Sequence, residues 1–204
     1  VSESIKRFGA FLPPYLEALH REIAYTGKLL ADSGYHIRSL YMGGGTPTTL
    51  SSPQMKELLR AIKDSFDLSR CLEFTVEGGR PDTLDEEKLR VIHDGGATRI
   101  SINPQTMADD VLAAVGRKHT AAQTVEAFRQ ARAVGFEDIN MDLIAGLPED
   151  TPEKFAASLS QVLALNPSNV TVHTLALKKG ADLFQRRVAL PSQADVARML
   201  EDAE

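Results

Sequence analysis

The chain has 204 residues, of which 43% are hydrophobic, which is enough for one α/β domain with its own core and too little to favour a second full domain. Its net charge of −5 and isoelectric point near 5.6 argue against a nucleic-acid partner. The sequence has no run of about 18 apolar residues that could span a membrane. We therefore expect a soluble, cytoplasmic protein. Cys71 is the only cysteine, which excludes an intrachain disulfide and any metal site built on several thiolates of this chain.

Five apolar runs rich in β-forming residues alternate with stretches of helical periodicity. The strand-like runs span residues 40–47, 72–77, 98–103, 139–144 and 170–175. This alternation predicts a right-handed succession of parallel strands and helices. Polar residues recur at the ends of the runs, which favours a barrel over an open sheet. A closed eight-stranded barrel needs about 250 residues, so the predicted fold is a partial barrel.

The first run ends in three consecutive glycines, Gly43 to Gly45. Glycine permits close approach of a ligand to the backbone and unusual backbone angles. Ligands of parallel α/β folds collect at the carboxyl ends of the strands, so Glu77, Gln105, Asp142 and Ala176 are expected to converge near this turn. The glycines are equally compatible with a turn that only reverses the chain.

Four segments at the ends of the predicted strands stand out. They are Tyr41-Met42-Gly43-Gly44-Gly45-Thr46-Pro47-Thr48, Val76-Glu77-Gly78-Gly79-Arg80-Pro81-Asp82-Thr83, Arg99-Ile100-Ser101-Ile102-Asn103-Pro104-Gln105-Thr106 and Asn140-Met141-Asp142-Leu143-Ile144-Ala145-Gly146-Leu147-Pro148. Together they resemble the radical S-adenosylmethionine enzymes of the oxygen-independent coproporphyrinogen III oxidase type, nearest to the HemZ-like branch. The resemblance covers residues 14 to about 180, with the motifs in order.

The resemblance implies a partial (β/α)6 barrel of the TIM-like type that binds S-adenosylmethionine and a four-iron four-sulfur cluster. In this family the cluster is held by a C-x-x-x-C-x-x-C loop after the first strand, and this sequence contains neither that loop nor that strand. We therefore expect residues 1–204 to be one barrel-core fragment, without the cluster ligands and without a C-terminal domain. Removal of the first strand is expected to leave the strand at residues 37–42 as an open edge, which either residues 1–12 cover or a second chain pairs with. The three charged side chains among residues 1–9 make a poor cover and favour self-association or conformational heterogeneity.

The resemblance places Gly43, Gly44, Gly45 and Thr46 against the methionyl amino group of the cofactor. It also implies that Glu77 faces the cofactor, where a carboxylate can accept hydrogen bonds from a cationic amino group. Taken without the resemblance, Thr46 only shapes the turn and Glu77 is a solvated residue at a strand end.

By the same resemblance, Gln105 and Asp142 lie near the ribose, and Arg117 pairs with the methionyl carboxylate because a guanidinium matches a carboxylate in two-point geometry. Ile144 and Ala176 pack against the adenine. Without the resemblance, Arg117 is an ordinary charged loop residue, and Ile144 and Ala176 are small apolar residues of the core.

The resemblance implies that the parent protein is an oxidoreductase. It would cleave S-adenosylmethionine reductively, and the 5′-deoxyadenosyl radical would abstract hydrogen from a porphyrinogen propionate and lead to decarboxylation. Its partners would be the porphyrinogen and an electron donor for the cluster, and no side chain of this chain is needed as a general acid or base. The fragment alone is expected to be inactive. Two alternatives stay open: a haem chaperone of the same family, and a phosphate-binding β/α barrel enzyme that needs no metal.

Overall fold

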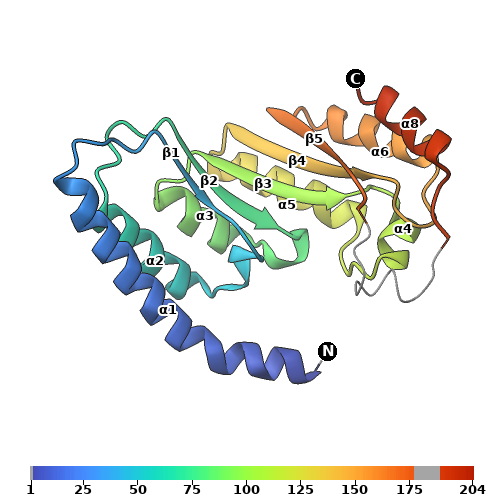
Figure 1. Ribbon diagram of the computed structural model, residues 1–204. Helices are drawn as coiled ribbons and strands as arrows, with labels where there is room; N and C mark the ends of the chain where they lie inside the picture. Colours follow the sequence, from blue (N-terminus) through green and yellow to red (C-terminus); the bar gives the residue numbers. More distant parts are fainter. Residues whose placement is uncertain (1, 177–188) are drawn as a thin grey trace.

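The structure is a computed structural model that describes residues 2–176 and 189–204, and it has an α/β fold built on one parallel sheet. The strand order is β1-β2-β3-β4-β5, so each strand pairs with its neighbour in sequence (Figure 1). All five expected strands are present, and the predicted α/β class with a parallel sheet is confirmed. Their bounds are β1 (Ser39–Met42), β2 (Glu73–Gly79), β3 (Arg99–Gln105), β4 (Asp138–Ala145) and β5 (Asn169–Thr174).

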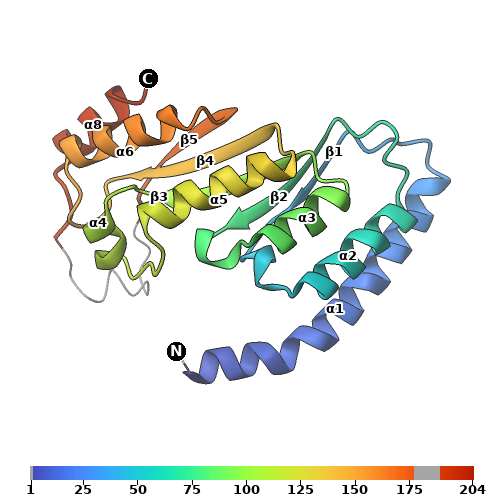
Figure 2. The same cartoon turned by 180° about the vertical axis from the view of Figure 1, so that it is seen from behind.

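Helices cover only one face of this sheet in the described part of the chain. Figure 1 looks onto the uncovered face, and Figure 2 shows the helices in front of the strands from the other side. The helices are α1 (Ser2–Ala31), α2 (Ser52–Ser65), α3 (Glu86–Asp94), α4 (Asp109–Ala114), α5 (Ala121–Val134), α6 (Pro152–Ala164) and α8 (Gln193–Glu201), with single 3-10 turns η1 (Pro47–Thr49) and η2 (Pro81–Thr83).

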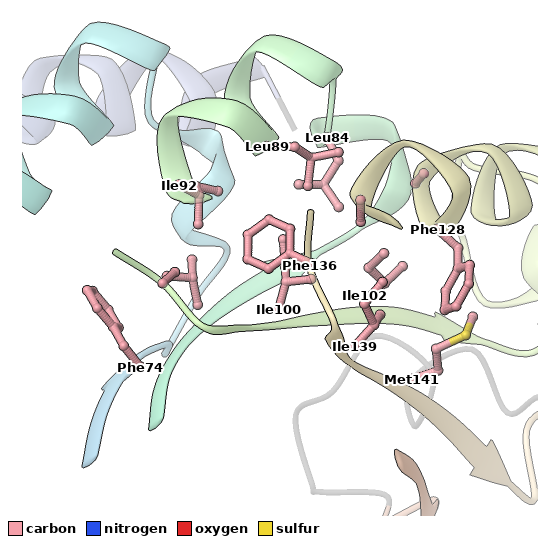
Figure 3. Packing of buried hydrophobic residues seen from close by; sticks show 14 of the residues in the cluster. Phe74, Leu84, Leu89, Ile92, Ile100, Ile102, Phe128, Phe136, Ile139 and Met141 are labelled. Carbon is pink, nitrogen blue, oxygen red and sulfur yellow. The ribbon is translucent and has the colours of Figure 1, made fainter. Parts of the chain in front are cut away.

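The main core lies between the sheet and these helices. Side chains of a strand alternate between its two faces, so every second residue of a strand points toward the helices. Ile100 and Ile139 are fully buried on neighbouring strands, and Figure 3 shows them beside Phe136, which lies in the connection from α5 to β4. The next residues on the helix side, Ile102 and Met141, are also fully buried.

The helix starts are fixed locally by side-chain caps. The Ser51 hydroxyl accepts a hydrogen bond from the Gln54 backbone N–H and caps α2, and Gln54 Oε1 accepts one from the Ser51 backbone N–H. Thr120 and Gln123 form the same reciprocal box at the start of α5. These caps define the residues at which α2 and α5 begin.

Strand β1 is the edge of the sheet and pairs only with β2 among the described strands. Helix α1 runs past this edge and packs on α2, and its first turns extend beyond the sheet (Figure 1). A largely apolar cavity of about 500 Å³ lies between α1, β1 and α2, and it reaches the glycine turn at Gly43 and Gly45. None of the helices in the described ranges combines the length and the apolar character that a membrane crossing requires.

Candidate functional site: the polar face and the carboxyl edge of the sheet

The face of the sheet that carries no helix is polar. The residues that alternate with the core on β2, β3 and β4 are Thr75 and Glu77, Arg99, Ser101 and Asn103, and Asp138, Asn140 and Asp142. The register aligns Glu77 with Ser101, and Ser101 with Asn140, across three strands. Polar side chains of this kind are costly to cover with apolar atoms, so this face is suited to a polar ligand.

The glycine turn after β1 lies directly against Glu77. The Tyr41 hydroxyl donates a hydrogen bond to Glu77 Oε1, and a Cβ added at Gly43 would lie only 2.9 Å from Glu77 Cδ and would also strike the Tyr41 ring. A side chain at position 43 would therefore displace Tyr41 and Glu77 from their present positions. Gly44 has a φ of +112°, which a residue with a side chain rarely adopts. The turn thus places bare backbone next to a carboxylate.

The Tyr41 hydroxyl is a hydrogen-bond donor to Glu77. Tyr41 is 61% exposed, but partial desolvation of its hydroxyl, the hydrogen bond to Glu77 and the negative charges of Glu77 and Asp142 raise the pKa of Tyr41 to about 12. The phenol therefore stays protonated at neutral pH. The influence of both carboxylates on one hydroxyl shows that Tyr41, Glu77 and Asp142 share a local electrostatic environment.

Asn140 holds Asp142 in place through a buried network. Its Nδ2 donates to Asp142 Oδ1 at 2.6 Å and to Ser101 Oγ at 3.0 Å. Its Oδ1 accepts from Asn169 Nδ2 at 2.5 Å and from Thr171 Oγ1 at 3.0 Å. The amide is 6% exposed and uses its full hydrogen-bonding capacity.

Asp142 is a half-buried carboxylate. Burial raises the pKa of Asp142, while the hydrogen bond from Asn140 and the nearby His173 act in the opposite direction. His173 Nε2 lies 4.0 Å from Asp142 Oδ2, at the open side of the sheet. A cationic or hydroxyl-bearing ligand would relieve the cost of this burial, because it would supply the charge or the donors that the carboxylate lacks.

Arg117 lies in the turn between α4 and α5, next to a different set of charges. The turn is anchored by a hydrogen bond between His119 Nε2 and the Pro104 carbonyl oxygen at 3.2 Å, at the end of β3. Burial lowers the pKa of Arg117, and Arg80 lowers it further, whereas Asp82 acts in the opposite direction. The charges of Arg80 and Asp82, after the end of β2, therefore act on Arg117.

The last three predicted residues lie at the ends of β3, β4 and β5. Gln105 is buried, ends β3 and has a φ of +71°. A left-handed conformation is uncommon for such a residue and is often found at functional sites. Ile144 is half-buried near the end of β4, opposite His173. Ala176 is exposed and follows β5 by two residues.

Two groups emerge from the ten predicted residues. Contacts or charge effects connect the glycine turn with Glu77 and Asp142, and a separate set connects Arg117 with the end of β2. The Thr46 methyl group lies 2.9 Å from where a Cβ of Gly79 would be, so the glycine turn touches the segment that leads to Arg80.

Sequence reasoning left out Tyr41, Asn140 and Arg80. The alternation of polar and apolar residues along β4 was a signal for Asn140, because it assigns Asn140 and Asp142 to the same face. Tyr41 has the same kind of signal in the alternation along β1, where it lies two residues before Gly43.

Cys71 lies at the opposite end of the strands from the carboxyl edge. It precedes β2 and its thiol donates to the Glu73 carbonyl oxygen, at the amino ends of the strands, whereas the glycine turn follows the carboxyl end of β1. Residues 2–176 and 189–204 contain no cluster of three or more side chains that could hold a metal ion.

The fold and the site define the class of protein. The model of the Radical SAM superfamily matches residues 8–162, and the chain belongs to this superfamily. The expected family membership is therefore confirmed.

The chain is similar to proteins whose names refer to coproporphyrinogen oxidases and to a heme chaperone. The chain is 39% identical to the oxygen-independent coproporphyrinogen-III oxidase-like protein HemZ of Bacillus subtilis over 93% of this chain and 38% of the relative. It is 37% identical to the heme chaperone HemW of the same organism over 92% of this chain and 50% of the relative. The solved coproporphyrinogen III oxidase (HemN) of Escherichia coli, described as a radical SAM enzyme, superimposes with a TM-score of 0.83 at 31% identity, covering 94% of this chain and 44% of that one.

The chain thus spans half or less of the length of these relatives. S-adenosylmethionine and a four-iron four-sulfur cluster are the cofactors of the family, and a more distant neighbour, the methyltransferase TsrM of Kitasatospora setae, is solved with a [4Fe-4S] cluster. The side chains at the carboxyl edge are chemically suited to S-adenosylmethionine, because bare backbone and two carboxylates lie where a cationic amino group could bind. Cys71 is not suited to the cluster, because it is a single thiol at the other end of the strands.

Proposed function

We propose that residues 1–204 form the S-adenosylmethionine-binding barrel core of an oxidoreductase of the coproporphyrinogen dehydrogenase type. The proposal is supported by the similarity to HemZ and HemN and, above all, by the contact between the Gly43 turn and Glu77. The parent protein would act on a porphyrinogen, with an electron donor for its cluster, in the cytoplasm and without a nucleic-acid or membrane partner.

The roles of individual residues follow from their positions at the edge. Glu77 and the carbonyl groups of Gly43 to Gly45 would accept hydrogen bonds from the amino group of the cofactor. Asp142, held by Asn140, would accept from the ribose hydroxyls. When bound beside its cluster, S-adenosylmethionine supplies the radical chemistry, and these residues orient it and exclude water.

Gln105, Arg117, Ile144 and Ala176 complete the proposed site. Gln105 would reach the ribose from the end of β3. Arg117 would bind the methionyl carboxylate, and Ile144 and Ala176 would pack against the adenine from the ends of β4 and β5. Because the lone Cys71 lies at the opposite end of the strands, we propose that this chain alone does not turn over substrate.

Binding of S-adenosylmethionine to the chain, measured by isothermal titration calorimetry, tests the proposal. Glu77→Gln and Asp142→Asn should each weaken binding by about tenfold, because each removes a charge-assisted acceptor. Asp138→Asn is the matched control: Asp138 lies on the same face of β4, pairs with Arg99 at 3.5 Å at the other end of the strand, and should leave binding unchanged. Equal affinities for all three variants and the unmodified chain would contradict the proposed site.

A haem chaperone is the second candidate, because two HemW relatives, from Bacillus subtilis and Lactococcus lactis, are 37% and 36% identical to this chain. The Gly78-to-Asp82 segment favours the dehydrogenase. The two activities separate in the full-length protein: coproporphyrinogen turnover under reducing conditions supports the dehydrogenase, and stoichiometric haem binding without turnover supports the chaperone. Membership of the radical SAM superfamily argues against the third alternative, a phosphate-binding barrel that needs no metal.

A further inference from the structure

Hydrogen bonds hold the backbone of Arg80 at the edge of the proposed site, just after β2. Its carbonyl oxygen accepts a hydrogen bond from Thr83 Oγ1 at 2.8 Å. The Thr83 hydroxyl lies 2.7 Å from Thr48 Oγ1, which donates to the Gly78 carbonyl oxygen at 2.7 Å. The preceding Gly79 has a φ of +65° and packs under Thr46. These contacts tie the segment that carries Arg80 to the chain that follows the glycine turn.

The charges around Arg80 are not balanced. Arg80 Nε lies 3.8 Å from Asp82 Oδ1, which is too long for a hydrogen bond. Arg117 is half-buried and forms no ion pair within the ranges 2–176 and 189–204. Arg80 and Asp82 follow β2, and the turn that carries Arg117 is anchored at the end of the neighbouring β3, where the charges of Arg80 and Asp82 both act on Arg117. A partly buried cation without a close counter-ion is unfavourable until an anion binds.

His119 does not contribute a third positive charge. It is 2% exposed, its Nδ1 is buried without a hydrogen-bond partner in the described structure, and burial lowers the pKa of the imidazole. The ring is therefore neutral at pH 7, and its role is to anchor the turn that carries Arg117. The excess positive charge belongs to Arg80 and Arg117.

We propose that Arg80 is a second carboxylate-binding residue that, together with Arg117, receives the methionyl carboxylate of S-adenosylmethionine. This inference rests on the proposed function and adds a residue to its site. A carboxylate has two oxygens, so two guanidinium groups approaching from the end of β2 and from the α4–α5 turn can each bind one of them. Asp82 holds Arg80 at the rim and competes with the ligand for it.

The test compares two ligands that differ in the amino-acid moiety. S-adenosylmethionine carries the carboxylate, and 5′-methylthioadenosine retains the adenosine and lacks it. The variants are Arg80→Gln, Asp82→Asn and, as a control, Arg90→Gln, which removes the same charge from the exposed Arg90 on α3. Affinities of the 204-residue chain are measured by NMR titration, and thermal unfolding of each variant confirms that it folds.

Arg80→Gln should weaken S-adenosylmethionine binding by about five- to tenfold and leave 5′-methylthioadenosine unaffected. Asp82→Asn should tighten S-adenosylmethionine binding, because the competing carboxylate is gone, and Arg90→Gln should change neither affinity. If the unmodified chain binds S-adenosylmethionine and Arg80→Gln binds it equally well, the role of Arg80 is wrong and the proposed function stands. If the unmodified chain binds neither ligand, both are wrong.

Discussion

Asp150 shows the cost of a buried charge at the scale of one residue. It is 5% exposed in the loop between β4 and α6, and its Oδ1 accepts a hydrogen bond from the Thr151 backbone at 2.9 Å. Its Oδ2 is buried without a donor among the described residues. Burial raises the pKa of Asp150 from 3.8 to about 6, although the Thr151 backbone and Lys154 act in the opposite direction.

The pH dependence of stability follows from this raised pKa. Between 3.8 and about 6 the folded chain holds more protons at Asp150 than the unfolded chain, so the free energy of unfolding falls as the pH rises through this window. Asp150→Asn should remove this fall and stabilise the protein at pH 7.5 by about 1–3 kcal/mol, as measured by urea denaturation at several pH values. Asp64→Asn, at an exposed position, is the control. An Asp150→Asn variant that keeps the same loss of stability between these pH values would show that the carboxylate does not carry the effect.

Gly43 allows a sharper test of the site at the residue scale. An added methyl group would collide with Tyr41 and Glu77, and so would displace the pair against which the glycine turn packs. Gly43→Ala should therefore weaken S-adenosylmethionine binding at least tenfold, by equilibrium dialysis. Gly9→Ala, on α1 and outside the proposed site, has open space around its Cβ position and is the control. Similar binding by both variants would argue against a steric role for Gly43.

Some of these residue-level features could be predicted from the sequence, and others could not. Glycines and charged residues at strand ends were readable because their position in the chain predicts their edge of the sheet. The grouping of Arg117 with Arg80 and Asp82 was not readable, because it depends on how the α4–α5 turn folds back onto β3. Likewise, the burial of Asp150 depends on packing of the loop before α6 and leaves no periodic signal.

At the scale of elements, the two faces of β4 separate the core from the site. Ile139 is fully buried against the helices, whereas Ile144 is half-buried at the proposed adenine contact. Ile139→Ala should destabilise the chain by about 2–5 kcal/mol through the cavity it leaves. Ile144→Ala should cost clearly less and should weaken S-adenosylmethionine binding instead. Chemical denaturation measures the first effect and calorimetry the second; equal losses of stability would mean that Ile144 belongs to the core.

Periodicity accounts for most of what was predictable at this scale. The apolar runs predicted all five strands, and the helical periodicity between them predicted that helices alternate with the strands. The short elements η2 and α4 have too few residues for a period to be visible. They nevertheless shape the rim, since η2 carries Asp82 and α4 leads to Arg117.

At the scale of the whole molecule, the free edge of β1 predicts self-association. Backbone groups on the outer side of β1 have no partner strand in the described part, and an apolar cavity lies beside them. Open strand edges favour pairing with another chain, so we expect this 204-residue chain to form dimers whose fraction rises with concentration. Sedimentation velocity over a range of concentrations measures this. A single monomeric species throughout would mean that the edge is protected in another way.

The central claim is that S-adenosylmethionine binds at the carboxyl edge of the sheet, between the glycine turn and Asp142. Amide NMR spectra of the isotopically labelled chain, recorded during titration with S-adenosylmethionine, test it most directly. The account predicts that the largest shifts occur at Gly43 to Thr46, Glu77, Gln105 and Asp142, with the exposed faces of α2 and α3 unchanged. Shifts concentrated on those helices, or no shifts at saturating ligand, would contradict it.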